Sequence, residues 1–247
     1  MIYDNPRFFP AGDMALVAEL GDAISPALNR RVRSLTDALE EDGVPGVFDF
    51  LPTYRSVLVY FDPLVATSGE VQDGIERLLQ RAQSTGTSAR NVVHLPTLYG
   101  GDLGPDIAFV AQHSGIDEQE VIRMHSGTDY LVYMMGFSPG FAYLGGLDER
   151  LATPRLQSPR TEIPPGAVGI AETQTGVYPV ASPGGWQLIG RTPVRLFDPA
   201  RERPVLLNAG DYVRFVPIES REHYDDILRQ VDAGEYVVNV ETEAAES

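Results

Sequence analysis

The stretch from Tyr133 to Asp198 constrains the fold more than any other part of this sequence. It holds 10 of the chain's 24 glycines and 8 of its 19 prolines. Glycine permits backbone conformations with positive φ, and proline fixes φ and removes a hydrogen-bond donor, so their dense alternation disfavours long helices. Short apolar runs lie between them, as is typical of a β-barrel or sandwich whose strands are joined by turns of defined shape.

Regular elements are expected within this stretch and on both sides of it. Helices are expected at Pro105–His113, Asp117–His125 and Ser220–Val231, and Asp117 and Glu120 form a capping-box pattern at the start of the second. The expected strands are Asn91–Thr97, Tyr130–Met135, Ala167–Ala171, Gly176–Ala181, Trp186–Arg191, Val194–Asp198 and Tyr212–Ile218.

The first 88 residues show a different pattern. Helices are expected at Ser25–Ala38, with Ser25 as the N-cap and Pro26 in the first turn, and at Val71–Gln83. Strands are expected near Arg7–Phe9 and at Met14–Leu20, Val47–Leu51 and Ser56–Phe61. The sequence therefore predicts a small α+β N-terminal domain over 1–88, a mostly-β barrel domain over 89–235 and an unstructured acidic tail over 236–247, with a Ser/Thr/Gly-rich linker at Thr85–Arg90.

Composition excludes several kinds of chemistry. The chain has no cysteine and no lysine, which rules out disulfides, thiolate metal sites, cysteine nucleophiles, Schiff bases and phosphate-loop lysines. His94, His113 and His223 show no metal-ligand spacing, so no metal site is expected. A net charge of −16 disfavours nucleic-acid binding, and no apolar stretch reaches the roughly 20 residues of a membrane span. Without a signal-peptide pattern, the protein is expected to be soluble and cytoplasmic, with neither nucleic acid nor membrane as a partner.

Charge is distributed unevenly along the chain. The Tyr133–Asp198 stretch has five arginines and five acidic residues and is neutral, while the other 14 arginines and 30 acidic residues account for the whole net charge of −16. A neutral, arginine-containing region in an acidic protein tolerates an anionic ligand, and it is equally suited to docking another protein.

Two similar turns, Ser138–Phe141 and Ser182–Trp186, each end in an aromatic residue. Such turns can present backbone N–H groups to a carboxylate or phosphoryl group with the rings as walls, or they can be tight barrel turns with aromatic plugs. Arg155, Arg160 and Arg191 each lie beside a proline-marked turn, where a guanidinium can offer a fork to an anion or simply add solubility. Neutral polar groups that could contact a ligand, or end a strand ladder, are those of Gln174, Tyr178 and Ser182.

His125 is expected at the end of a helix, where it can interact with the helix dipole or act as a general base. Templates for nucleotide binding are missing from the sequence. It contains no GxGxxG and no Walker motif, so any ATP is not bound by a phosphate loop. Although Gly136–Gly140 matches GxSxG, the segment Phe137–Phe141 is not expected to build a nucleophile elbow.

Long motifs in the same region resemble a known family. MGFSPGFAYLGGLD, VGIAETQTGVYP and SPGGWQLIGRTPVRLFDP, together with Gly12–Leu16 and Pro52–Tyr54, are similar to allophanate hydrolase subunit 1, also described as the carboxyltransferase C and D domain. This family includes the B subunit of prokaryotic 5-oxoprolinase and the sporulation-kinase inhibitor of bacilli, and the same module lies within urea carboxylase. The resemblance covers nearly the whole chain.

The resemblance implies an α+β domain followed by a cyclophilin-like barrel, and a hydrolase subunit that is active only in a complex. The expected function is that of the B subunit of an ATP-dependent 5-oxoprolinase, which cleaves 5-oxoproline to L-glutamate. The expected partners are a larger cyclophilin-like subunit (of the type of allophanate hydrolase subunit 2 or the C subunit of 5-oxoprolinase), in a heterodimer or heterotetramer, and a third, lactam-utilisation protein. ATP is the implied cofactor, bound together with the partner subunit. The alternatives are a carboxyltransferase subunit of allophanate and urea metabolism and a non-enzymatic inhibitor of a sensor histidine kinase.

Thirteen positions that match the family's motifs are carried over as site candidates. Four are expected to be catalytic: His125, Arg155, Arg160 and Arg191. Nine are expected to bind substrate: Phe137, Gly140, Tyr143, Gln174, Tyr178, Ser182, Gly184, Gly185 and Trp186.

Overall fold

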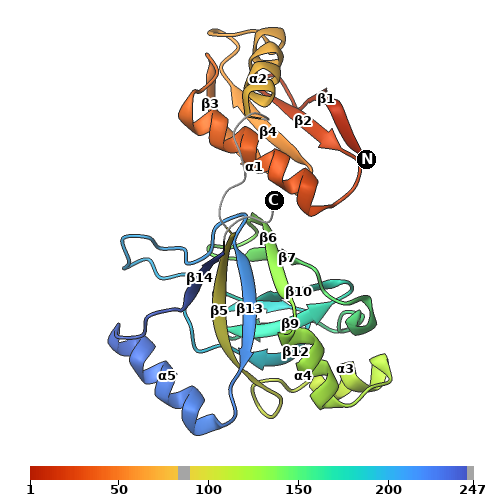
Figure 1. Cartoon of the computed structure of the whole chain (residues 1–247), viewed down its shortest axis with the longest axis vertical. Helices are drawn as coiled ribbons and strands as arrows, with labels where there is room; N and C mark the ends of the chain where they lie inside the picture. The colour runs from red at the N-terminus through yellow and green to blue at the C-terminus, as the bar shows by residue number, and fades with distance from the viewer. Residues whose placement is uncertain (83–89, 244–247) are drawn as a thin grey trace. The chain divides into compact units, whose positions relative to one another are not determined.

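A computed structural model describes residues 1–82 and 90–243 (Figure 1). These residues fall into two compact units, one formed by residues 1–82 and the other by residues 90–243. The expected linker Thr85–Arg90 lies, except for its last residue, outside the described residues. No helix in the two described ranges is long and apolar enough to cross a membrane.

The first unit is a four-stranded antiparallel sheet with two helices on one face. The strands are ordered β1-β2-β4-β3, and both helices share one hydrophobic core with the inward side chains of the central strands β2 and β4. The elements are β1 (Ile2–Pro10), β2 (Ala15–Gly21), α1 (Pro26–Glu41), β3 (Val47–Pro52), β4 (Ser56–Phe61) and α2 (Ser68–Ala82).

Local sequence signals explain where α1 begins and which face of it is buried. The Ser25 side chain accepts a hydrogen bond from the Leu28 N–H, so Ser25 is the predicted N-cap and Pro26 opens the helix. The buried positions Leu28, Val32, Leu35 and Leu39 recur at helical spacing.

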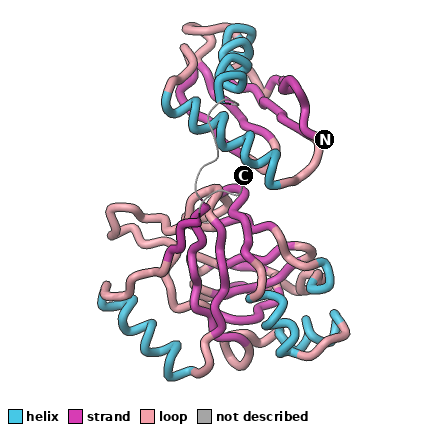
Figure 2. Tube along the Cα trace, in the orientation of Figure 1, coloured by secondary structure: helices cyan, strands magenta, loops and turns pink. Residues whose placement is uncertain are grey.

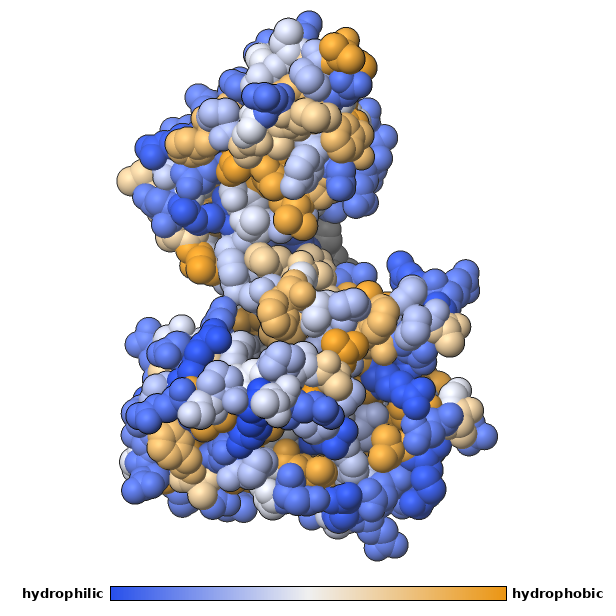
Figure 3. Space-filling view, turned by 180° about the vertical axis from the view of Figure 1, so that it is seen from behind, coloured by the Kyte–Doolittle hydropathy of each residue, from blue (hydrophilic) through white to orange (hydrophobic). Residues whose placement is uncertain are grey.

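Apolar side chains also reach the opposite face of this sheet. In the register of the strands, Phe9 pairs with Val17, Val17 with Leu58, and Leu58 with Leu51, so one row of apolar residues crosses all four strands. Phe9 and Leu51, on the two edge strands, are exposed. Figure 3 shows hydrophobic residues on the surface of this unit as seen from behind.

The second unit is mostly β, which confirms the predicted barrel. Its strands are magenta in Figure 2. The main sheet follows the path β10-β9-β12-β5-β13-β6-β7, and β14 pairs with β5. The ends of the path, β7 and β10, lie side by side, so the barrel is nearly closed. Its strands are β5 (Arg90–Tyr99), β6 (Asp129–Met135), β7 (Ala142–Gly145), β9 (Ala167–Ala171), β10 (Gln174–Val177), β12 (Gln187–Arg191), β13 (Tyr212–Pro217) and β14 (Val240–Glu243), and β8 (Arg160–Ile163) and β11 (Ser182–Gly184) form a separate pair.

Three helices accompany this barrel: α3 (Ile107–Ser114), α4 (Glu118–Ser126) and α5 (Arg221–Ala233). The Asp117 carboxylate accepts a hydrogen bond from the Glu120 N–H at 2.7 Å, which confirms the predicted cap of α4. The Glu120 side chain instead pairs with Arg123, so only one half of the expected capping box is used.

The short strands β7, β8 and β11 were not predicted, and two predicted segments differ in kind from the expectation. The predicted strand Val194–Asp198 is irregular and makes only an isolated bridge between Phe197 and Val205. Its apolar pattern reflects Val194 and Leu196, which fill the core without joining a sheet. The expected tail over 236–247 is also corrected in part, because Val240–Glu243 pairs with the start of β5, while residues 244–247 lie outside the described residues.

Candidate functional site

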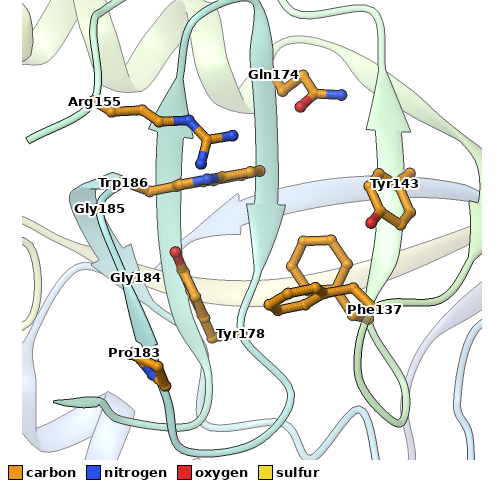
Figure 4. A pocket seen from close by; sticks show the side chains of 10 residues that line it. Phe137, Tyr143, Arg155, Gln174, Tyr178, Pro183, Gly184, Gly185 and Trp186 are labelled. Atoms are coloured by element: carbon orange, nitrogen blue, oxygen red, sulfur yellow. The ribbon is translucent and has the colours of Figure 1, made fainter. Parts of the chain in front are cut away.

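A pocket of about 160 Å³ lies where β7 and β10 meet at the seam of the barrel (Figure 4). Five segments form its walls. They are the β6–β7 loop, β7, the stretch from the first residue of β10 (Gln174) to the residue after its end (Tyr178), the turn that leads into β12, and the segment that follows Thr153. Its lining residues are Phe137, Phe141, Tyr143, Arg155, Gln174, Tyr178, Pro183, Gly184, Gly185 and Trp186. Eight of the thirteen predicted site residues are therefore brought together.

Aromatic rings make most of the wall. Phe141 is at the centre, with ring centroids 5.2 Å from Tyr143, 6.1 Å from Trp186 and 6.3 Å from Tyr178, all edge to face. Phe141, Tyr178 and Trp186 are buried, so this cluster is a rigid apolar surface rather than a set of mobile rings.

Two glycines make room for these rings. A Cβ atom at Gly184 would overlap the Tyr178 hydroxyl, and one at Gly176 would lie 3.2 Å from the Trp186 indole. The glycine density of the sequence is therefore needed here for close approach of side chains to the backbone, in addition to turn formation.

Phe137 lies at the pocket with unusual backbone geometry. Its φ is +66°, a conformation that costs a residue with a side chain about 1–2 kcal/mol. The ring is 74% exposed and stands edge-on to Phe141 at 5.6 Å. The ring therefore offers apolar surface to the solvent directly beside the pocket.

Arg155 is the one cation of the lining, and its backbone is fixed on both sides. The Pro154 carbonyl accepts a hydrogen bond from the Gln187 side chain at 2.8 Å, and the Leu156 N–H donates to the Gly185 carbonyl at 2.7 Å. No hydrogen bond or ion pair within the described residues engages its guanidinium, which is exposed. Arg155 is thus the side chain best placed to bind an anion in this pocket.

Tyr178 is polar but not acidic. Burial raises the pKa of its hydroxyl above the usual value, although a hydrogen bond with the Trp186 backbone and the charges of Arg155 and Arg160 act in the opposite direction. The group therefore stays protonated at neutral pH and can donate a hydrogen bond.

Arg160 does not line the pocket. Its guanidinium pairs with the Asp106 carboxylate at 2.8 Å and approaches the Trp186 carbonyl at 3.4 Å. The charge of Arg160 is thus already paired with that of Asp106, which makes Arg155 the better candidate for the expected anion-binding fork.

Three further candidates lie outside the pocket. The Arg191 Nε donates to the Pro165 carbonyl at 2.8 Å, at the opposite end of β12 from Trp186. Ser182 pairs with Ile163 in the β8–β11 ladder. Gly140, with φ of +78°, lets its loop pack against Phe197.

The amide groups of the turn containing Gly140 are also engaged. The Phe141 N–H donates to the Ser138 carbonyl at 3.0 Å, and the Ser138 N–H donates to the Gly136 carbonyl at 2.8 Å. These two N–H groups shape the turn, which favours the aromatic-plug interpretation over ligand binding by the backbone of this turn.

His125 is completely buried in the barrel core. Thr175 donates its hydroxyl hydrogen to the Gly169 carbonyl at 3.0 Å, so its oxygen accepts from the His125 Nε2–H at 2.8 Å. The His125 Nδ1 then accepts from the Tyr99 hydroxyl at 2.8 Å. With both nitrogens engaged and no exposure, His125 joins α4 to the sheet, and the expectation of a general base is corrected.

We expect His125 to stay neutral throughout the range of pH 5–8. Burial lowers its pKa to about 3, whereas the unfolded chain protonates near pH 6.5. Its contribution to stability is therefore complete above about pH 6.5 and is lost as the pH falls toward 3. NMR titration of the ring protons should show no step for His125 between pH 5 and 8, and a step near pH 6.5 in urea; a step in the folded protein would contradict the buried position.

Some residues of the site were not among the thirteen candidates. Phe141 and Pro183 line the pocket, and the signal for both was the pair of aromatic-ended turns to which they belong. Asp106 is distant in sequence from Arg160, and nothing in the sequence relates the two. No group of residues that could hold a metal ion occurs in the described ranges.

Comparison with known proteins adds a family context. Residues 6–207 match the family model of the carboxyltransferase domain, subdomain C and D. The chain is 40% identical over 227 residues to the B subunit of the 5-oxoprolinase of Bacillus subtilis, covering 86% of this chain and 93% of that protein. It is 41% identical over 211 residues to the B subunit of the 5-oxoprolinase of Escherichia coli O157:H7, covering 85% and 95%.

A solved structure shares the fold. The crystal structure of the K. lactis urea amidolyase superimposes with a TM-score of 0.76 and 23% sequence identity, covering 96% of this chain and 16% of that one. At this identity the likeness concerns the fold alone. The region that corresponds to this chain is a small part of the much longer urea amidolyase.

Proposed function

Because the chain belongs to the family of the carboxyltransferase domain, subdomain C and D, we propose that it is the B subunit of an ATP-dependent 5-oxoprolinase, which opens the lactam ring of 5-oxoproline to give L-glutamate. The observation that carries this proposal is the similarity to two proteins of that name over more than four fifths of the chain. The pocket at the barrel seam is the proposed substrate site.

The pocket has the size and chemistry for a small cyclic acid. Its volume of about 160 Å³ is below the ~300–1,000 Å³ of typical drug-sized sites, which suits a compact metabolite. Arg155 can bind the carboxylate of 5-oxoproline, and the aromatic walls can hold its ring. Tyr143 and Gln174 both line the pocket and lie on the side away from Arg155 (Figure 4), where their polar groups can contact the lactam amide.

A lactam is a resonance-stabilised amide, so its hydrolysis needs activation of the carbonyl oxygen. In the assembled complex, ATP would supply that activation by phosphorylating the oxygen with release of ADP. One water would then add to the carbon and the C–N bond would break, and a second water would release phosphate from the resulting acyl phosphate to give the carboxylate. The pocket is too small for a nucleotide and offers a single unpaired guanidinium, and the sequence has no Walker motif. We therefore place ATP binding in the assembled complex, with the partner subunit.

The proposed partner is a larger cyclophilin-like subunit that corresponds to the C subunit of 5-oxoprolinase, in a heterodimer or heterotetramer, joined by a third, lactam-utilisation protein. The two relatives are each named as one lettered subunit of 5-oxoprolinase, which supports a multi-subunit enzyme. Phe137, 74% exposed beside the pocket, is a suitable contact for a partner that completes the site.

The test is reconstitution of the complex. Co-expression with the larger cyclophilin-like partner and the third protein should give glutamate from 5-oxoproline only when ATP is present, whereas this chain alone should give none. Allophanate, offered to the same preparation, should yield no ammonia above background. If all three proteins are present and no glutamate forms, the proposal fails.

A further inference from the structure

Asp106 stands immediately before α3, yet its carboxylate does not cap that helix. An aspartate at an N-cap normally accepts a hydrogen bond from a backbone N–H in the first turn of its own helix. Here one oxygen accepts from the Leu188 N–H at 2.6 Å and the other from Arg160 at 2.8 Å. The carboxylate therefore hydrogen-bonds to two residues that are distant in the sequence, Arg160 and Leu188.

These contacts converge on the segment that carries Trp186. The Asp106 N–H also donates to the Leu188 carbonyl at 2.9 Å, so Leu188 is held at both of its backbone polar groups. On the other side, Arg160 reaches the Trp186 carbonyl at 3.4 Å. Asp106 and Arg160 thus hydrogen-bond to the backbone on both sides of Gln187, where β12 begins.

These hydrogen bonds hold the backbone of Trp186, whose side chain lines the proposed substrate pocket. The Trp186 indole packs edge-on against Phe141 and Tyr178, at 6.1 and 6.0 Å, and is 9% exposed. The pair itself lies outside the lining, and its side chains are only 14% and 29% exposed. Asp106 also pairs with the charge of Arg160, which lies outside the lining, whereas Arg155 is the one cation of the lining.

We propose that Asp106 is a positioning residue of the substrate pocket: through Arg160 and the backbone of Leu188, its carboxylate fixes the Trp186 wall and keeps Arg160 out of the pocket. The effect on catalysis rests on the proposed function. The effect on Trp186 does not, and it can be measured on this chain alone.

Trp186 is the only tryptophan of the chain, so intrinsic fluorescence reports the pocket wall directly. In the full chain, Asp106→Asn and Arg160→Gln should each shift the emission to longer wavelength and raise the acrylamide quenching constant about twofold or more. Arg160→Lys keeps the charge without the planar fork, so it should fall between Arg160→Gln and the unmodified chain. The matched control is Asp148→Asn. It removes the exposed ion pair between Asp148 and Arg150, neither of which lines the pocket, and should leave the emission of Trp186 unchanged.

In the reconstituted complex, Asp106→Asn should raise KM about tenfold, the equivalent of one charged hydrogen bond, with a much smaller change in kcat. Emission and quenching identical to those of the unmodified chain in both Asp106→Asn and Arg160→Gln would overturn the proposal. If Asp106→Asn does not fold, the test is made with Arg160→Lys and Arg160→Gln: altered emission and quenching support the proposal, and unchanged values overturn it. Altered fluorescence without any enzyme activity in the unmodified complex would refute only the proposed function.

Discussion

Replacing Arg155 by alanine should lower kcat/KM of the reconstituted complex roughly 10- to 100-fold, mostly through KM. The reason is that Arg155 is the only guanidinium of the lining, is held by a turn fixed at Pro154 and Leu156, and has no internal partner within the described residues. Loss of one hydrogen bond to a charged group costs about 1.5–3 kcal/mol, which corresponds to this range. The measurement is the steady-state rate of glutamate formation over a range of 5-oxoproline concentrations.

The comparison variants separate charge from geometry. Arg155→Lys keeps a positive charge but loses the bidentate fork, so it should recover part of the affinity. Arg150→Ala removes another exposed arginine of the same stretch, one that is already paired with Asp148 and does not line the pocket, and it should have no effect on KM. Size-exclusion chromatography should show intact assembly for both. An unchanged KM in Arg155→Ala would mean that the substrate carboxylate is bound elsewhere.

Trp186→Ala should have the largest effect on stability. The indole is 9% exposed and lies against Phe141 and Tyr178, so its removal leaves a large void in the wall of the barrel. Truncations of buried large aromatic residues cost about 3–5 kcal/mol. In a unit of this size this lowers the Tm by roughly 6–20 °C, measurable by calorimetry of the full chain.

Two substitutions control for this result. Trp186→Phe retains an aromatic ring and should recover most of the loss. Phe109→Ala removes an aromatic side chain that is 46% exposed on α3, and the Tm should change little. If Trp186→Ala and Phe109→Ala were equally mild, the aromatic cluster would not be a rigid part of the core.

The sequence predicted the barrel because its strands have local signals. Apolar runs bounded by glycine and proline favour strands, and most of the expected strands of the second unit are present. The prediction was wrong at Val194–Asp198, where the same local pattern arises from side chains that fill the core. Strand pairing depends on partners far away in the chain, so the local pattern alone could not distinguish the two cases.

The pocket lies in the stretch in which the sequence placed most of its candidates, but the pairing of the arginines was not predicted. Arg155 and Arg160 have nearly identical local sequences, a proline followed by the arginine, and both were expected to bind an anion. Only the tertiary structure reveals that Arg160 is paired with Asp106 while Arg155 is not. His125 shows the same limit, because its burial depends on Tyr99 and Thr175, which come from distant strands.

The pairing of β14 with β5 has a consequence for how the protein is made. β5 begins the second unit, at Arg90, and β14 ends the described chain, with Glu243 opposite Arg90 and Val240 opposite Val93. During synthesis, β5 is the first strand of the unit to leave the ribosome and β14 is the last. One edge of the start of β5 therefore stays unpaired until β14 has emerged. The first unit can fold earlier during synthesis, because all of its strands are already available. β14 lies off the path of strands that closes the barrel, so the rest of the barrel can form before β14 emerges and covers this edge of β5.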